Sequence, residues 1–140
     1  MEAPSPARLY AAVAGAFLLL LGIVGFFYYA SFGSLDRYEE ALGGLEVNGW
    51  LNLVYVAVGS VGILVAGVSS RTYSLSVGAL FVLLAIVGWG DGTLNLVVGL
   101  LGLAAVAGTP SPSRGSFFTF RRKKERRDLE ARAKPAGKRA

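Results

Sequence analysis

The sequence predicts an all-α membrane protein whose four transmembrane helices form two tandem helical hairpins, with both termini in the cytoplasm. More than half of the 140 residues are hydrophobic, and the charged residues are confined to a few short clusters. The uncharged stretches between these clusters approach or exceed the roughly 20 apolar residues that a bilayer span needs. They are residues 9–35, 47–70, 72–90 and 92–113. No polar face remains that would cover four such helices in water.

The first span covers about residues 9–30. An apolar run this close to the N-terminus also resembles a secretory signal, but a signal ends in small residues before its cleavage site. This run ends in four bulky rings, Phe26, Phe27, Tyr28 and Tyr29. Rings of this kind suit the aromatic belt at a membrane interface. We therefore expect the first span to be retained.

The remaining spans follow an acidic outer loop, residues 31–49, which is long enough for a short surface helix. The spans cover about residues 50–68, 73–89 and 93–108, so residues 1–108 form one four-helix transmembrane domain. The turns between these spans are only a few residues long, and such short turns make neighbouring helices antiparallel. Residues 109–140 form a Pro/Ser linker and a basic cytoplasmic tail.

The orientation follows from the positions of lysine and arginine, which concentrate in cytoplasmic loops. Arg8, Arg71 and the basic tail all lie on one side of the predicted spans. The opposite side receives the net acidic segment 36–46 and Asp91. We therefore expect a multi-pass protein of the cell membrane, in bacteria the inner membrane.

An internal repeat relates the two predicted hairpins. Residues 48–54 match residues 91–97 at five of seven positions and share the element Leu-Asn-Leu-Val. Gly59 and Gly102 then follow Asn52 and Asn95 by seven residues, and Gly15-Ala16 of the first span aligns with Gly78-Ala79 of the third. Such a parallel duplication predicts a pseudo-twofold axis along the membrane normal.

The residues available for chemistry are few. The chain has no histidine and no cysteine, and no span carries an ionisable residue at its centre. We therefore predict no catalytic residues, no metal and no cofactor, and coupled transport is poorly supported. Asn52 and Asn95 open their spans at equivalent places in the repeat, so they either bond across helices or line a small outward-facing vestibule.

Glycines recur at one-turn or two-turn spacing within the predicted spans. Small residues let membrane helices approach closely, so these glycines serve packing inside the bundle or association with a second copy or another membrane protein. The groups are Gly15 with Gly22 and Gly25, Gly59 with Gly62, and Gly99 with Gly102.

The tail places aromatic residues directly before a basic cluster. This order suits the anionic inner leaflet, where rings bury among headgroups and basic side chains meet lipid phosphates. The residues concerned are Phe117, Phe118, Phe120, Arg121, Arg122, Lys123, Lys124, Arg126 and Arg127. Opposite charges four apart in this region also favour a short helix. The alternative is that the tail is a topology signal only. We do not expect nucleic-acid binding, which charge alone would support.

Two segments carry a family resemblance: Val-Asn-Gly-Trp-Leu-Asn-Leu-Val at 47–54 and Thr-Tyr-Ser-Leu-Ser-Val-Gly at 72–78. With the four spans and the long first loop, they resemble a bacterial membrane family catalogued as domain of unknown function 4383, over roughly residues 8–108. The resemblance implies the same architecture but no established activity. Family members typically carry histidines at positions corresponding to Leu51 or Tyr55 and to Asn95. A histidine-dependent role therefore does not carry over to this chain.

These observations favour a noncatalytic integral membrane protein that acts through helix packing or a partner, while its tail docks on anionic lipid. The partners expected are the lipid bilayer, anionic headgroups, and a second copy or another membrane protein. The alternative is a small channel or transporter whose path runs between the two hairpins or between protomers.

A peptide covering residues 116–134 should bind vesicles that contain anionic lipid, because each lysine or arginine near such a surface contributes about 1 kcal/mol. Added salt should weaken the binding steeply, and alanine at Phe117, Phe118 and Phe120 should abolish it. Co-sedimentation with vesicles measures both effects. Equal binding to neutral and anionic vesicles would remove the electrostatic part. A peptide that binds neither leaves the tail as a topology signal.

Overall fold

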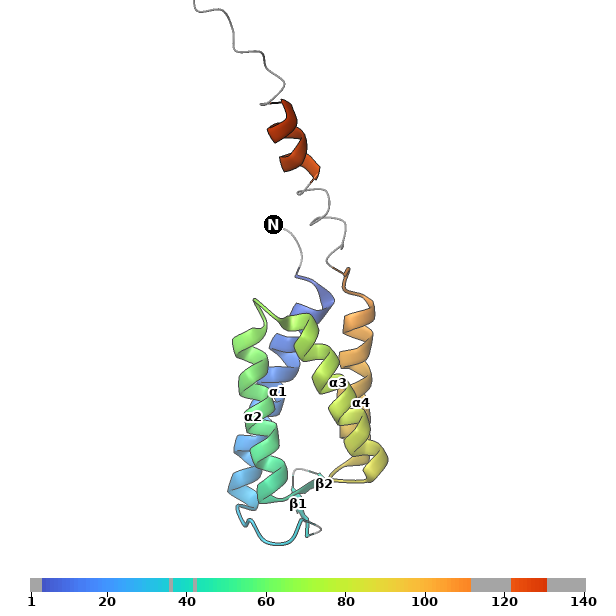
Figure 1. Cartoon of the computed structure of the whole chain (residues 1–140). Helices are drawn as coiled ribbons and strands as arrows, with labels where there is room; N and C mark the ends of the chain where they lie inside the picture. The colour runs from blue at the N-terminus through green and yellow to red at the C-terminus, as the bar shows by residue number, and fades with distance from the viewer. Residues whose placement is uncertain (1–3, 36, 42, 112–121, 131–140) are drawn as a thin grey trace, which may run out of the picture. The chain divides into compact units, whose positions relative to one another are not determined.

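The computed structural model describes residues 4–35, 37–41, 43–111 and 122–130. The chain divides into two compact units, Met1–Thr109 and Pro110–Ala140. The first unit contains four helices and a two-stranded sheet (Figure 1): α1 Pro6–Tyr28, β1 Glu39–Ala41, β2 Leu45–Val47, α2 Gly49–Val65, α3 Ser70–Val87 and α4 Gly92–Ala107. The second unit contains a helix over residues 122–130. The spacing of opposite charges predicts this short helix.

Three of the four long helices begin at a side-chain cap. Ser5, Asn48 and Asp91 each accept a hydrogen bond from the backbone amide three residues further on. Such a cap satisfies one of the free amides that every helix start leaves exposed. α3 differs, because its N-cap Ser69 makes no such bond. At its other end α3 stops at Gly88, whose φ of 73° lies in the left-handed region that ends many helices.

The loop between α1 and α2 holds a β-hairpin in place of the surface helix considered for it. β1 pairs with β2 in antiparallel register, with Glu40 opposite Glu46. Gly43 and Gly44 in the turn have φ values of 81° and 102°. Glycine adopts positive φ without steric cost, and these two residues reverse the chain into a hairpin. A helix would need negative φ at both positions.

The four helices form two tight antiparallel hairpins, α1 with α2 and α3 with α4 (Figure 1). The backbones touch where glycines meet. A methyl group built on Gly59 would lie 2.6 Å from the carbonyl oxygen of Gly15, and one on Gly99 would lie 3.0 Å from that of Gly78. A side chain at either position would separate the helices, so glycine sets the spacing of both hairpins.

The two hairpins are related by a pseudo-twofold axis that runs along the helices. Adding 63 to a residue number in α1 gives its equivalent in α3, and adding 40 to a number in α2 gives its equivalent in α4. Gly15 thus corresponds to Gly78, and Gly59 to Gly99. The same rule relates Gly62, which packs against the Ala11 carbonyl, to Gly102, which packs against that of Ser74. The contacts themselves therefore repeat.

Two equivalent tyrosines join the hairpins across this axis. The Tyr10 hydroxyl on α1 donates to the carbonyl oxygen of Val98 on α4 over 2.9 Å. The Tyr73 hydroxyl on α3 donates to that of Val58 on α2 over 3.0 Å. The centroids of the two rings are 6.4 Å apart. Each hairpin therefore supplies one donor and one acceptor to the other.

The equivalence of Gly59 with Gly102 that the sequence repeat suggests is wrong. The contacts make Gly59 equivalent to Gly99, which shifts the alignment of α4 on α2 by three residues relative to the Leu-Asn-Leu-Val match, whereas the alignment of α3 on α1 is unchanged. Three residues of helix rise about 4.5 Å. Asn95 is therefore equivalent to Tyr55, not to Asn52. The second hairpin is the shorter one, because α3 has 18 residues where α1 has 23.

Further hydrogen bonds tie the hairpins together at both ends. At the end that holds the start of α1, Thr109 accepts from the Ala7 amide over 2.9 Å and from the Arg71 guanidinium over 3.0 Å. At the opposite end the carbonyl oxygen of Leu35 accepts from Asn48 over 3.3 Å and from the Trp89 indole over 3.2 Å. Arg71 and the start of α1 thus lie at one end, and the β-hairpin loop at the other.

Among the described helices, α1 and α3 are long and apolar enough to cross a membrane. α2 and α4 are also apolar but have only 17 and 16 residues. Their ends lie within three residues of the spans expected from the sequence, and the same holds for α1 and α3.

Gly59→Ala should lower the free energy of unfolding in detergent by about 2 kcal/mol, because the methyl group must push α1 and α2 apart. Gly67→Ala is the matched control, since a methyl group built there meets no atom within 4 Å. Thermal unfolding followed by circular dichroism measures both. An equal effect of the two substitutions would contradict the close contact at Gly59.

Candidate functional site

Three of the four buried polar side chains among the described residues gather at the end of the bundle that holds the β-hairpin loop, and the fourth, Ser74, bonds to Ala7 near the start of α1. Asn48, Asn52 and Asn95 are all at most 1% exposed. Asn48 caps α2, and the other two lie one turn inside the starts of α2 and α4. We call these three asparagines and Tyr55, which is also buried, the polar layer. The asparagines lie near the starts of α2 and α4 because the caps Asn48 and Asp91 set where these two helices begin.

Asn52 and Asn95 make the same kind of bond, although they are not equivalent under the pseudo-twofold. The Asn52 amide donates to the Tyr29 carbonyl oxygen over 3.0 Å, and the Asn95 amide donates to that of Trp89 over 2.8 Å. Both acceptors lie just past the end of the preceding helix, where carbonyl groups lack a partner within the helix. Each asparagine therefore ties the start of one helix to the end of the helix before it. Because both side chains are fully buried, neither lines an open vestibule in this conformation.

Three oxygen atoms of the polar layer have no hydrogen-bond partner among the described residues: Asn52 Oδ1, Tyr55 Oη and Asn95 Oδ1. Asn52 Oδ1 faces Gly25 of α1, and any side chain at Gly25 would collide with it. The Tyr55 ring stacks on Phe81 with centroids 6.0 Å apart. The layer can therefore accept hydrogen bonds, but it presents no strong nucleophile and no histidine or carboxylate for proton transfer.

The described residues contain no group of three or more His, Cys, Asp or Glu side chains that would hold a metal ion. Asp91, four residues before Asn95, is engaged as the cap of α4, accepting from the Leu94 amide over 2.7 Å. The sequence-based expectation of no metal and no catalytic residue stays a prediction.

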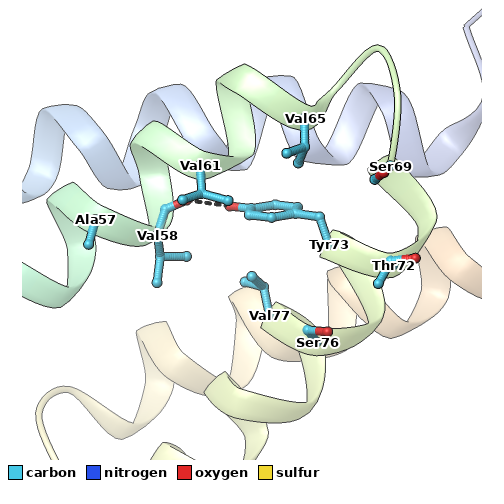
Figure 2. Close-up of a pocket in the computed structure, with 9 residues that line it drawn as sticks. All are labelled: Ala57, Val58, Val61, Val65, Ser69, Thr72, Tyr73, Ser76 and Val77. Carbon is cyan, nitrogen blue, oxygen red and sulfur yellow. Dashed lines mark hydrogen bonds between the residues drawn. The ribbon is translucent and has the colours of Figure 1, made fainter.

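Two pockets lie between the hairpins. One, of about 420 Å³, lies between α2 and α3 (Figure 2) and the other, of about 520 Å³, between α1 and α4. Every lining residue of the first is equivalent under the pseudo-twofold to a lining residue of the second. The first is lined by Ala57, Val58, Val61, Val65, Ser69, Thr72, Tyr73, Ser76 and Val77. Their equivalents are Val97, Val98, Leu101, Ala105, Pro6, Leu9, Tyr10, Val13 and Ala14.

The tail residues predicted to contact lipid fall into two sets. Arg122, Lys123, Lys124, Arg126 and Arg127 lie on the helix over residues 122–130 and are exposed. The others, Phe117, Phe118, Phe120 and Arg121, lie outside the described residues.

The sequence repeat missed the reciprocal tyrosines, although a signal for them exists. Arg-x-Tyr occurs at residues 8–10 and again at 71–73, each time five residues before the aligned Gly-Ala pair. A search for this triplet would have found the pair that joins the hairpins.

Asn52→Leu should lower the free energy of unfolding by about 1 kcal/mol, the typical value of a side-chain hydrogen bond between membrane helices. The change removes the donor to Tyr29 but keeps a side chain of similar volume. Leu53→Ala is the control, because Leu53 is 44% exposed on the outer face of α2. Unfolding in detergent compares the variants. A neutral Asn52→Leu would show that the bond contributes nothing net.

Comparisons with curated proteins and with solved structures give no match. A family model described as Domain of unknown function (DUF4383) matches residues 8–95. The matched region begins at the start of α1, includes α2 and α3, and ends at Asn95 in α4. Since the match covers more than half of the chain, the chain belongs to this family of unknown function.

Proposed function

We propose that this chain is a noncatalytic integral membrane protein that spans the bilayer four times and acts through contact with a partner in the membrane. The observation that carries the proposal is the apolar outer surface of the bundle. Leu64, Val68 and Ile86 are 78%, 90% and 76% exposed, and large apolar side chains are exposed on all four helices of the first unit. Soluble monomers rarely expose contiguous apolar surface on this scale.

The lengths of α2 and α4 suit this proposal when their flanking residues are included. A helix of 17 residues is about 25 Å long, somewhat less than the roughly 30 Å of a bilayer's hydrocarbon core. Ala66, Gly67 and Val68 extend α2 with apolar surface. A small remaining mismatch is accommodated by local thinning of the bilayer.

Charge supports an orientation with both termini in the cytoplasm. Arg8 and Arg71 are equivalent under the pseudo-twofold and lie toward the end of the bundle where α1 begins. The β-hairpin at the opposite end carries Glu39, Glu40 and Glu46. Basic residues favour the cytoplasmic side. The exposed basic side chains on the helix over residues 122–130 would then face the inner leaflet, whose anionic lipids attract them.

A path between the two hairpins receives less support than a packing role. The space around the pseudo-twofold axis is filled by one cluster of buried side chains that draws on all four helices. It includes Tyr10, Leu18, Tyr55 and Phe81. A close-packed interior of this kind leaves no continuous polar route.

Impermeant thiol labelling in intact cells tests the orientation, because the chain has no native cysteine to interfere. Ser34→Cys should react from outside, whereas Gly67→Cys and Ser111→Cys should react only after the cells are opened. The protein should also stay with the membrane during an alkaline carbonate wash. Labelling of Ser111→Cys in intact cells would reverse the orientation, and release by carbonate would contradict membrane insertion.

A further inference from the structure

The polar layer leaves an unpaired oxygen atom at equivalent places in the two hairpins. Tyr55 on α2 and Asn95 on α4 correspond to each other under the pseudo-twofold, so they lie at the same depth in the bundle. Tyr55 is 1% exposed and Asn95 is 0% exposed. Neither Tyr55 Oη nor Asn95 Oδ1 has a hydrogen-bond partner among the described residues. A buried polar atom without a partner is unfavourable, so both atoms call for one.

A carboxylate and a second hydroxyl group lie close to these atoms. The Tyr55 hydroxyl interacts electrostatically with the Asp91 carboxylate and with Tyr38 in the loop after α1. Asp91 precedes Asn95 by one helical turn. The Tyr38 hydroxyl accepts from the Gly90 amide over 3.3 Å. α2, the start of α4 and the loop therefore bring four polar groups together beside the turn between α3 and α4.

These four groups have complementary hydrogen-bonding capacity left. Asn95 Oδ1 and Asp91 Oδ2 can only accept, and the other Asp91 oxygen already accepts from the Leu94 amide. The Tyr55 and Tyr38 hydroxyl groups each keep a proton to donate. Among the described residues, the Tyr55 hydroxyl has no partner, and the Tyr38 hydroxyl is bonded only as an acceptor. The four groups thus offer two acceptors and two donors.

We propose that a buried water molecule binds among these four groups and joins the two hairpins at this end of the bundle. The water donates to the Asn95 and Asp91 oxygens and accepts from the two tyrosine hydroxyl groups, which uses all four. A buried water typically makes about three such bonds to groups that would otherwise be unpaired. A sodium or potassium ion would satisfy the oxygen atoms but would leave the two hydroxyl protons without an acceptor. Water therefore fits the site better than a cation does.

A surface pocket of about 450 Å³ adjoins the site. Two of its lining residues take part in the bonds described above. Tyr38 supplies one of the hydroxyl groups, and the Trp89 carbonyl oxygen accepts from the Asn95 amide over 2.8 Å. The other lining residues are Leu35, Val87 and Gly88. This pocket gives water a path to the site from the end of the bundle that holds the β-hairpin loop.

Hydroxyl-radical footprinting of the full-length protein in detergent tests the water site, because radicals formed from a bound water molecule modify the side chains around it. Tyr73 is the matched control, since its hydroxyl is already bonded to Val58. Tyr55 should be modified several-fold faster than Tyr73, although Tyr73 is the more exposed of the two, at 7% against 1%. Mass spectrometry of the digested protein measures both rates.

Two variants connect the modification of Tyr55 to the site. Asn95→Leu removes an acceptor of the water and should slow the modification of Tyr55 several-fold, with Tyr73 unchanged. Asn52→Leu makes the same substitution at a buried asparagine whose unpaired oxygen faces Gly25 of α1, and it should leave Tyr55 unchanged. An equal effect of the two variants on Tyr55 would overturn the site, because it would show a general loosening of the bundle.

Two further outcomes would also overturn the water site. Modification of Tyr55 no faster than that of Tyr73 in the unmodified sequence would mean that the four groups bond to one another directly. The midpoint of thermal unfolding should be the same in sodium, potassium and choline chloride at equal ionic strength. Stabilisation by sodium or potassium that Asn95→Leu removes would assign the site to a cation instead.

Discussion

The bundle depends on the close approach of backbones within each hairpin. In a bilayer, apolar side chains gain little by leaving lipid for one another, so helix association relies on van der Waals contact and hydrogen bonds. Gly15 against Gly59 and Gly78 against Gly99 bring the backbones into contact at equivalent places. The polar layer then adds hydrogen bonds within each hairpin at one end. Because residue 25 is a glycine, the Asn52 side chain fits against α1, and its amide donates to a carbonyl at the end of that helix.

The helices pack more closely within each hairpin than between the hairpins, which are joined by a small set of hydrogen bonds. Tyr10 and Tyr73 exchange hydrogen bonds across the axis, and Thr109 and Leu35 collect bonds from both hairpins at opposite ends. All of these bonds but one are accepted by a backbone carbonyl; the exception is the bond from the Ala7 amide, which the Thr109 hydroxyl accepts. A helical carbonyl that already accepts within its helix still has a second lone pair, so tyrosine can bond to it without breaking the helix.

Much of this arrangement can be read from the sequence, because it follows from local patterns. Long uncharged runs locate the helices, and Asn48 and Asp91 mark the starts of α2 and α4 as caps. The three-residue shift between the hairpins cannot be read this way. The Leu-Asn-Leu-Val match aligns helix starts, whereas the packing is decided by which glycines meet. The β-hairpin was missed because its signal is confined to Gly43 and Gly44 in an otherwise acidic loop.

The shift also explains why equivalent residues take different roles. Tyr55 and Asn95 occupy the same place in their hairpins, yet Tyr55 stacks on Phe81 while Asn95 closes the short turn after α3. The short turn after α3 brings the end of that helix within reach of Asn95, one turn into α4. After α1 the loop is longer, and the asparagine that reaches the end of that helix is Asn52, which lies three residues before Tyr55. The pseudo-twofold therefore preserves the contacts between backbones and leaves side chains free to differ. The same freedom separates the linings of the two pockets: Ser69, Thr72 and Ser76 in one pocket are equivalent to Pro6, Leu9 and Val13 in the other.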